Sequence, residues 1–362
     1  MLVIKPEDSV AVTNVQPSAM TADASKMAKL YFMMSSTLYT DKFMSIIREL
    51  CSNARDSHAE AGKLDTPFAI IAPTLLDPRL IIGDVGTGID YPKAKETILM
   101  FLGSTKDEDD EERGFMADDA IGGWGIGAKS PRAYTSTYQV IMRLDGIETA
   151  VQVFDQKGMP QEVAMYTEKT SKPKGLEFIV PIKPADVPEW RRKVVEYMKF
   201  TNYNVEAFMG DGEVIRPEKP FGTVKYDDFT VEIYGTPDRY SKGHSEKPPI
   251  LLYGGMRYEI PSSFNLKAQL DEIAKLLSFG LEIRINVTKP NAVKFGLSRE
   301  HLELETQTLN LVTYAVKILH DDMKKEWEQS FSTRTFRRYS EVLKYSAEVQ
   351  AAVEAGKASL YG

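Results

Sequence analysis

The ten residues 48–57 constrain this chain more than any other stretch of its sequence. Apolar side chains recur there at helical spacing, which predicts a helix with one buried side: Ile46, Ile47, Leu50 and Ala54. Glu49, Asn53 and Asp56 stand at i, i+4 and i+7, so they share one helix face. A carboxylate can activate a water, and an amide oxygen can bind a hard cation such as Mg²⁺. Polar stripes also occur on ordinary solvated helix faces, so the stripe alone fits either a catalytic site or a surface.

The helix around this stripe has recognisable ends. It should begin near Asp41, whose side chain can cap the first turn, and end near Gly62, a residue type typical of the position just after a helix. Two strands are predicted after it, at 68–72 and 79–82, because these short apolar runs are separated by prolines. A short helix is then expected at 93–102.

A second polar motif, Asp84-Val85-Gly86-Thr87-Gly88, directly follows the second of these strands. A carboxylate at a strand end can accept a hydrogen bond from an exocyclic amine. Gly86 and Gly88 let the backbone turn tightly and approach a planar base. A turn that only ends the strand would explain the same residues.

A glycine-rich segment at 122–130 is the third motif. Its glycines expose consecutive backbone N–H groups, and a helix beginning near Ala128 would point its positive end at an anion. Lys129 can add a charge, as can Lys106 beside the hydroxyls of Ser104 and Thr105. The acidic run 107–112 is expected to be an exposed loop tip. The chain lacks both the P-loop pattern and a strand-linked G-x-G-x-x-G, which disfavours a P-loop or Rossmann site.

In order and spacing, the three motifs resemble those of the GHKL ATPases, which include gyrase B subunits, ninety-kilodalton heat-shock chaperones, sensor histidine kinases and MutL proteins. The family pattern is E-x-x-x-N-x-x-D, then D-x-G-x-G, then G-x-x-G-x-G. The resemblance implies ATP and Mg²⁺ as cofactors, with Glu49 as the base that activates water, Asn53 as the magnesium ligand and Asp84 as the adenine contact. Leu176 departs from the threonine that the family often has near adenine, which puts that contact in doubt.

The same resemblance implies a larger set of residues that bind the nucleotide. They are Asn53, Asp56, Asp84, Gly86, Gly88, Ser104, Thr105, Lys106, Gly122, Gly123, Gly125, Ile126, Gly127 and Lys129. Residues 138–182 alternate in strand fashion and predict an antiparallel sheet with helices on one face. A helix at 189–200 follows. The expected fold is α+β, with a Bergerat-type α/β sandwich ATPase domain over residues 1–215.

A smaller domain is expected after the proline-bounded linker 217–220. Its strands are predicted at 229–235, 249–260 and 281–287, with an amphipathic helix at 264–279. This order resembles the S5-like transducer domain of the GHKL proteins, here placed at 220–305. A helical segment, 306–362, with helices at 306–330 and 335–356, completes the chain and ends abruptly, as a fragment of a longer protein would.

Ser298-Arg299-Glu300 resembles the chaperone middle-domain element whose arginine reaches the γ-phosphate. The resemblance implies that Arg299 completes the catalytic site when the domains close, with Lys294 as the other candidate. A helix-start capping arrangement explains the same three residues equally well. Together these motifs look closest to phage rIIA-type or chaperone-like members of the superfamily.

Composition excludes several other classes of protein. The net charge of −7 provides no overall basic field, so nucleic-acid binding is not indicated. The single cysteine, Cys51, rules out an internal disulfide and suits a reducing compartment, so a cytoplasmic location is expected. No apolar run has the length of a membrane span, and the four histidines are too scattered for a zinc site.

Three functions fit these observations. The first is an ATPase whose nucleotide state switches a dimer or a protein partner; the resemblance implies an ATP-gated homodimer, in which the N-terminal strand material at 2–16 can cross to the other subunit. The second is an ATP-binding module with little turnover and a structural role. The third, a histidine kinase, needs a phosphoacceptor helix ahead of the catalytic domain, and none precedes Glu49.

Overall fold

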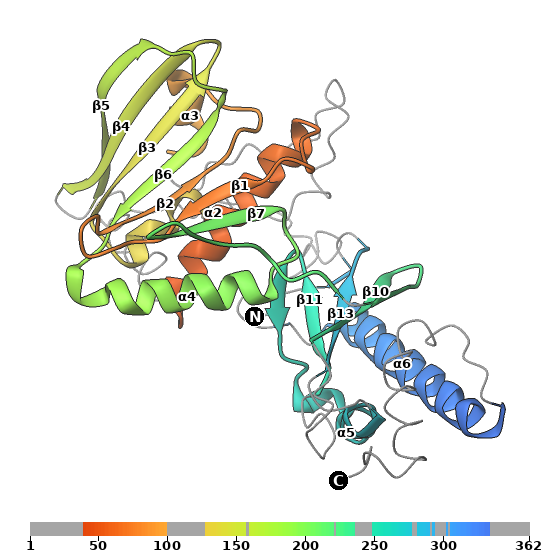
Figure 1. Ribbon diagram of the computed structural model, residues 1–362. Coiled ribbons are helices and arrows are strands. Elements are labelled where there is room, and N and C mark those ends of the chain that lie inside the picture. The colour runs from red at the N-terminus through yellow and green to blue at the C-terminus, as the bar shows by residue number, and fades with distance from the viewer. Residues whose placement is uncertain are drawn as a thin grey trace, which may run out of the picture.

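The computed structural model describes residues 39–99, 127–156, 159–220, 222–235, 248–276, 281–289, 292–293, 302 and 305–333. These residues form a mixed α+β protein with an eight-stranded sheet and a five-stranded sheet, each with helices packed alongside (Figure 1). The elements predicted at 2–16, 23–38 and 335–356 lie outside the described residues. No described helix is long and apolar enough to cross a membrane.

The larger sheet has the strand order β5-β4-β3-β6-β2-β1-β7-β8. Its strands are β1 (Phe68–Ile71), β2 (Arg79–Gly83), β3 (Thr137–Leu144), β4 (Ile147–Gln156), β5 (Met159–Lys169), β6 (Gly175–Pro181), β7 (Val205–Gly210) and β8 (Glu213–Ile215). Only β1 and β7 run parallel among the pairs described; the other neighbours are antiparallel. The predicted antiparallel sheet at 138–182 is confirmed, with an extra strand, β5, that the alternation of apolar residues did not indicate.

One face of this sheet carries the helices α2 (Lys42–Glu60) and α4 (Val187–Phe200). The core lies between them and alternate strand residues, because the side-chain period of a strand puts every second residue on the same face. The expected ends of α2 are confirmed: the side chain of Asp41 accepts a hydrogen bond from the Met44 amide at 3.1 Å, and Gly62 has the positive φ of +65° that ends many helices.

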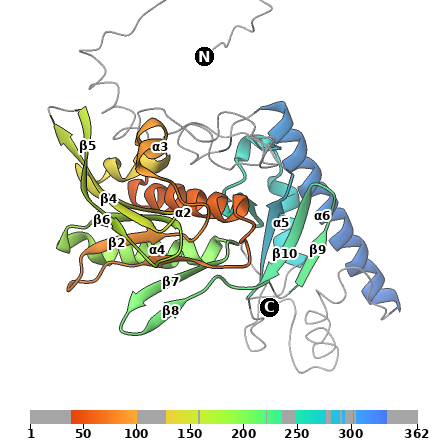
Figure 2. The ribbon, with the colours of Figure 1, turned by 90° about the horizontal axis from the view of Figure 1, so that it is seen from above.

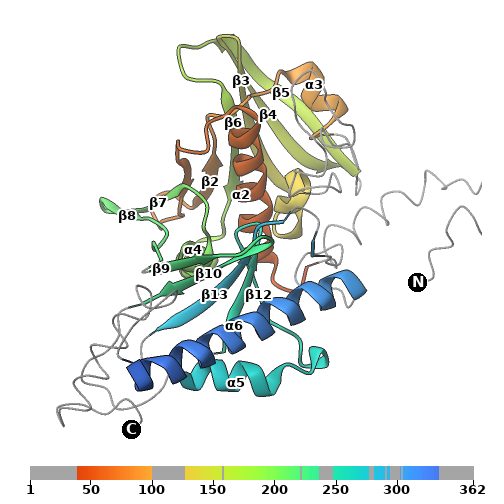
Figure 3. The same ribbon diagram turned by 90° about the vertical axis from the view of Figure 1, so that its right-hand side faces the viewer.

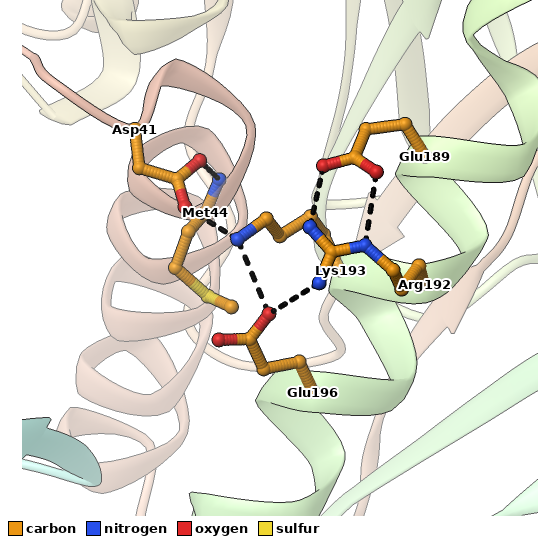
Figure 4. Close-up of polar contacts among 6 residues, drawn as sticks. All are labelled: Asp41, Met44, Glu189, Arg192, Lys193 and Glu196. Carbon is orange, nitrogen blue, oxygen red and sulfur yellow. Dashed lines mark hydrogen bonds and ion pairs between the residues drawn. The ribbon is translucent and has the colours of Figure 1, made fainter.

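A buried lysine joins the two helices (Figure 4). The Nζ atom of Lys193 on α4 lies 2.6 Å from a carboxylate oxygen of Asp41 and 3.1 Å from one of Glu196. Asp41 therefore caps α2 with one oxygen and pairs with α4 through the other. This contact fixes the start of α2 against the rest of the layer.

The smaller sheet has the order β12-β11-β13-β10-β9. Its strands are β9 (Gly222–Lys225), β10 (Phe229–Tyr234), β11 (Ile250–Tyr253), β12 (Met256–Tyr258) and β13 (Glu282–Val287). The parallel strands β11 and β13 are connected through α5 (Lys267–Leu276), and α5 packs beside the long helix α6 (Thr306–Thr333), as Figures 2 and 3 show. A second core fills the space between this sheet and the two helices.

Most predictions for this part of the chain are confirmed. The helices expected at 264–279 and 306–330 and the strands at 229–235 and 281–287 are present with small shifts of their ends. The single strand expected at 249–260 is instead a hairpin of β11 and β12. Gly254 and Gly255 form its turn with positive φ angles of +56° and +70°, a conformation that glycine adopts easily.

This hairpin also contacts the first sheet's layer. Nε of Arg48, on α2, donates to Sδ of Met256 at 3.0 Å, and the hydroxyl of Tyr203 donates to the Gly254 carbonyl. A Cβ atom on Gly255 would lie 2.5 Å from the Tyr203 ring, so a side chain there would push the two parts away from one another. The helix that carries the polar stripe is thus in direct contact with the second sheet.

Candidate functional site

The polar stripe of α2 is largely buried. Glu49 is 8% exposed and Asp56 only 3%, while Asn53 is half-buried. Two carboxyl side chains on the inner side of a helix are costly unless other groups solvate them. One such group is the Arg55 guanidinium, which lies 3.2 Å from Asp56. The stripe is therefore not an ordinary solvated helix face, which was the alternative open from the sequence.

Gly127, the last glycine of the third motif, lies directly against this stripe. A Cβ atom built on Gly127 would be 2.7 Å from Oε2 of Glu49 and 3.3 Å from Nδ2 of Asn53. A larger residue at this position would have to displace the end of the Glu49 side chain, since real Cβ contacts do not come so close. The fold thus brings the first and third motifs together at the middle of α2.

The helix expected near Ala128 begins at Gly127 and is a seven-residue 3₁₀ helix, η3 (Gly127–Ala133), not an α-helix. Pro131 explains the difference, because it has no N–H for an α-helical hydrogen bond and disfavours α conformation in the residue before it. Lys129 is buried, and its Nζ donates to the Thr97 carbonyl at 3.3 Å. Its expected contact with phosphate stays a prediction.

Asp84 stands at the end of β2 and is 7% exposed. Its Oδ1 accepts hydrogen bonds from the Ser57 hydroxyl at 3.0 Å and from the Gly86 amide at 2.8 Å. Burial raises the pKa of Asp84 to about 6, and these hydrogen bonds oppose the rise. Because a carboxylate has about four acceptor positions, the group retains capacity for a donor from a ligand.

The two glycines of this motif are required by close approach. A Cβ on Gly86 would lie 2.2 Å from Oγ of Ser57, and one on Gly88, which has a φ of +68°, would lie 2.3 Å from the Arg143 carbonyl. The observed close neighbours of the two glycines are α2 and β3, and their expected approach to a planar base stays a prediction. Gly175, before Leu176 on β6, was not predicted, and its Cβ would lie 2.0 Å from the Asp84 carbonyl oxygen.

Three further residues, not among the predicted site residues, shape the loop of residues 84–88, the Asp84 loop. Ser57 lies one turn beyond Asn53 on the same helix face and bonds Asp84. His58 Nε2 accepts from the Val85 amide at 3.0 Å, and Nζ of Lys63 donates to the Val85 carbonyl at 2.6 Å. Ser57 had a signal, because it continues the Glu49–Asn53 spacing by another four residues. His58 and Lys63 had none.

Part of the predicted site lies outside the described residues, namely Ser104, Thr105, Lys106, Gly122, Gly123, Gly125, Ile126, Lys294 and Arg299. Within the described residues, no group of three or more His, Cys, Asp and Glu side chains is placed to hold a metal ion. Cys51 is fully buried, and burial raises the pKa of its thiol, so it is an unreactive core residue.

The described site is a row of polar groups along one helix face. Glu49 and Asn53 meet Gly127 at the middle of α2, and Ser57 meets Asp84 near its end. Comparison with known proteins leaves this geometry as the main guide to function. No protein-family model matches the chain, and no curated protein matches it.

Proposed function

We propose that this chain binds Mg²⁺-ATP and hydrolyses it, as a GHKL-type ATPase. The observation that carries the proposal is the meeting of three motifs, far apart in sequence, along one face of α2. Glu49 and Asn53 lie against Gly127 on this face, and Ser57 contacts Asp84 one turn beyond Asn53. A nucleotide has the same two ends, a charged polyphosphate and a hydrogen-bonding base.

Asp84 is the group that suits the base. It is a buried acceptor whose Oδ1 is held by Ser57 and Gly86, so its orientation is set before a ligand arrives. An adenine amino group can donate to it. A purine with a carbonyl at that position would place its oxygen, an acceptor, against the Asp84 carboxylate, also an acceptor. Leaving such a buried acceptor without a donor costs about 1–3 kcal/mol.

Asn53 and Glu49 suit the phosphate end. The Asn53 amide oxygen would hold Mg²⁺, and the other ligands would be nucleotide oxygens and water, because magnesium commonly binds proteins through only one or two side chains. Glu49, four residues earlier on the same face, would take the proton of the attacking water. Gly127 brings the polypeptide next to both groups, as a lid over phosphates requires.

The architecture supports the finer assignment of the fold. A mixed sheet with helices on one face corresponds to the Bergerat-type sandwich, and the smaller sheet with its β11–α5–β13 crossover corresponds to the S5-like transducer. We propose that nucleotide binding closes the segment before Gly127 and shifts the second sheet, with Arg299 or Lys294 reaching the γ-phosphate. Homodimerisation, or the binding of a protein partner, would then depend on whether ATP is bound.

The first test is ATP turnover by the wild type and Glu49→Ala. Loss of a general base slows turnover by roughly 10²–10⁴-fold, and ATP binding should persist because Asp84 is untouched. Glu60→Ala is the matched control, since Glu60 lies on the same helix but is exposed at its last turn. Turnover of Glu49→Ala equal to that of the control would refute the assignment of the base.

An ATP-binding module with little turnover is the second candidate. The close approach of Gly127 to Oε2 of Glu49 favours it, because that oxygen faces the polypeptide in this conformation. Equilibrium binding of Mg²⁺-ATP, combined with the mass in solution with and without a non-hydrolysable analogue, separates the two. Binding without turnover and without a change in mass selects the module; turnover with analogue-dependent dimerisation selects the switch.

A further inference from the structure

Two residues at the end of α2, Ser57 and His58, bond the Asp84 loop, and His58 has no role in the proposed chemistry. We propose that His58 is a positioning residue: its neutral imidazole holds the Val85 peptide so that Asp84 is presented to the nucleotide base. The inference rests on the proposed function for the identity of the ligand. The hydrogen bonds that support it lie within the protein and involve no ligand.

The hydrogen bonds of His58 allow only one form of its ring. Nε2 lies 3.0 Å from the Val85 amide, which can only donate, so Nε2 must be the acceptor. Nδ1 lies 2.9 Å from the Thr66 carbonyl, which can only accept, so Nδ1 must carry the hydrogen. A second proton on the ring would place a donor against the Val85 donor and break this bond.

The other polar group of the same peptide is held as well. Nζ of Lys63 donates to the Val85 carbonyl at 2.6 Å, and the Lys63 amide donates to the His58 carbonyl at 2.7 Å. Ser57, the residue before His58, bonds Asp84 and accepts from the Thr87 amide at 3.1 Å. Ser57 and His58 on α2, with Lys63 just after the helix, therefore hold the Asp84 side chain and the polar backbone groups of Val85 and Thr87.

The surroundings of His58 keep it neutral. Burial, with the charge of Lys63 as a smaller cause, lowers the pKa of His58, and the hydrogen bonds to the Thr66 and Lys63 backbone oppose this. From β1, the ring of Phe68 faces the imidazole at 6.1 Å, edge to face, and carries no charge. From the end of β2 the Val85 amide faces it, with the buried carboxyl of Asp84 on the preceding residue.

Two substitutions separate the hydrogen bond from the packing. His58→Gln keeps an amide oxygen that can reach the Val85 amide, whereas His58→Phe keeps a ring beside Phe68 and loses both nitrogens. Hydrogen exchange of the peptide over residues 80–90 in nucleotide-free protein measures the loop directly. We expect exchange to be faster by about tenfold in His58→Phe, the factor that ~1.4 kcal/mol produces, and close to wild type in His58→Gln.

ATP assays should then show a change in binding without a change in chemistry. Mg²⁺-ATP should bind His58→Phe about tenfold more weakly, with kcat at saturation unchanged, because Glu49 and Asn53 lie further back along α2. His320→Phe is the control. His320, on α6, pairs with Glu272 on α5, and both helices pack with the five-stranded sheet, whereas the Asp84 loop follows a strand of the eight-stranded sheet. It should change neither exchange nor affinity.

The pH profile adds a readout that packing alone would not change. In the wild type, affinity should fall below about pH 6.5 with up to two protons, one on His58 and one on Asp84, whereas His58→Gln should retain only the proton on Asp84. Loop exchange in His58→Phe equal to that of wild type would overturn the role of His58, whether or not ATP binds. Wild-type protein that binds no Mg²⁺-ATP would instead refute the proposed function.

Discussion

Replacing Arg284 with methionine should destabilise the protein by about 3–5 kcal/mol, the usual cost of removing one partner from a buried ion pair. Arg284, on β13, is 1% exposed. Its Nε donates to Glu282 at 2.8 Å and its Nη1 donates to the Lys199 carbonyl at 2.8 Å. Its guanidinium also lies 3.6 Å from the centre of the Tyr234 ring. Methionine fills similar volume but leaves the Glu282 carboxylate, on the same sheet face, without its cation.

Arg257 provides the matched control, because both arginines lie over the same ring. Their guanidinium carbons are 4.8 Å and 5.2 Å from the centre of Phe200, on α4. The Arg257 side chain is 41% exposed, however, and its partner Glu259 is 88% exposed at 3.7 Å. Exposed ion pairs and cation–π contacts each contribute up to about 1 kcal/mol, so Arg257→Met should cost ~1 kcal/mol.

The assay is urea unfolding followed by circular dichroism, with the slope of each transition compared between variants. Arg284 joins β13 to the end of α4, but Arg48 and Tyr203 also bond the β11–β12 hairpin, so a single transition should remain in Arg284→Met. Equal stabilities of the two methionine variants would refute the reasoning, because they would show that burial of Arg284 carries no extra energy. Arg284→Lys should recover little, since lysine cannot reproduce the planar fork.

Three further predictions concern the Asp84 loop. Gly86→Ala should lower the melting temperature and weaken ATP binding, because its Cβ would meet both the side chain and the backbone of Ser57. Gly62→Ala should cost only the strain of its left-handed φ of +65°, about 1 kcal/mol, because nothing lies within 4 Å of its Cβ; equal losses in the two variants would contradict this. Burial raises the pKa of Asp84 to about 6. The stability that protonated Asp84 contributes is therefore full below pH ~4 and is lost as the pH rises through 6. Asp84→Asn should remove this pH-dependent loss in urea titrations, and it should weaken ATP binding. The pKa of His58 is lowered, so its contribution to the free energy of unfolding is present above pH ~6.5 and is lost on acidification. If His58→Gln lost stability at acidic pH as the wild type does, this reasoning would be wrong.

Local sequence information was enough for most of the secondary structure. Asp41 and Gly62 mark the ends of α2 because capping depends on a few neighbouring residues. Strand β5 escaped prediction because it is an edge strand with few buried side chains, so its sequence lacks a clear apolar alternation. The sequence predicts a helix beginning near Ala128, and its 3₁₀ form follows from Pro131, a residue that is also visible in the sequence.

The sequence by itself determined the helix, its polar stripe and the glycines, because periodicity and turn chemistry are properties of neighbouring residues. Only the tertiary structure decided that Glu49 is buried, that Gly127 lies against it, and that His58 holds Val85, 27 residues further along the chain. A helical stripe looks the same from sequence whether it faces water or a second layer. Burial depends on which distant surfaces pack together, and that information is in the fold as a whole.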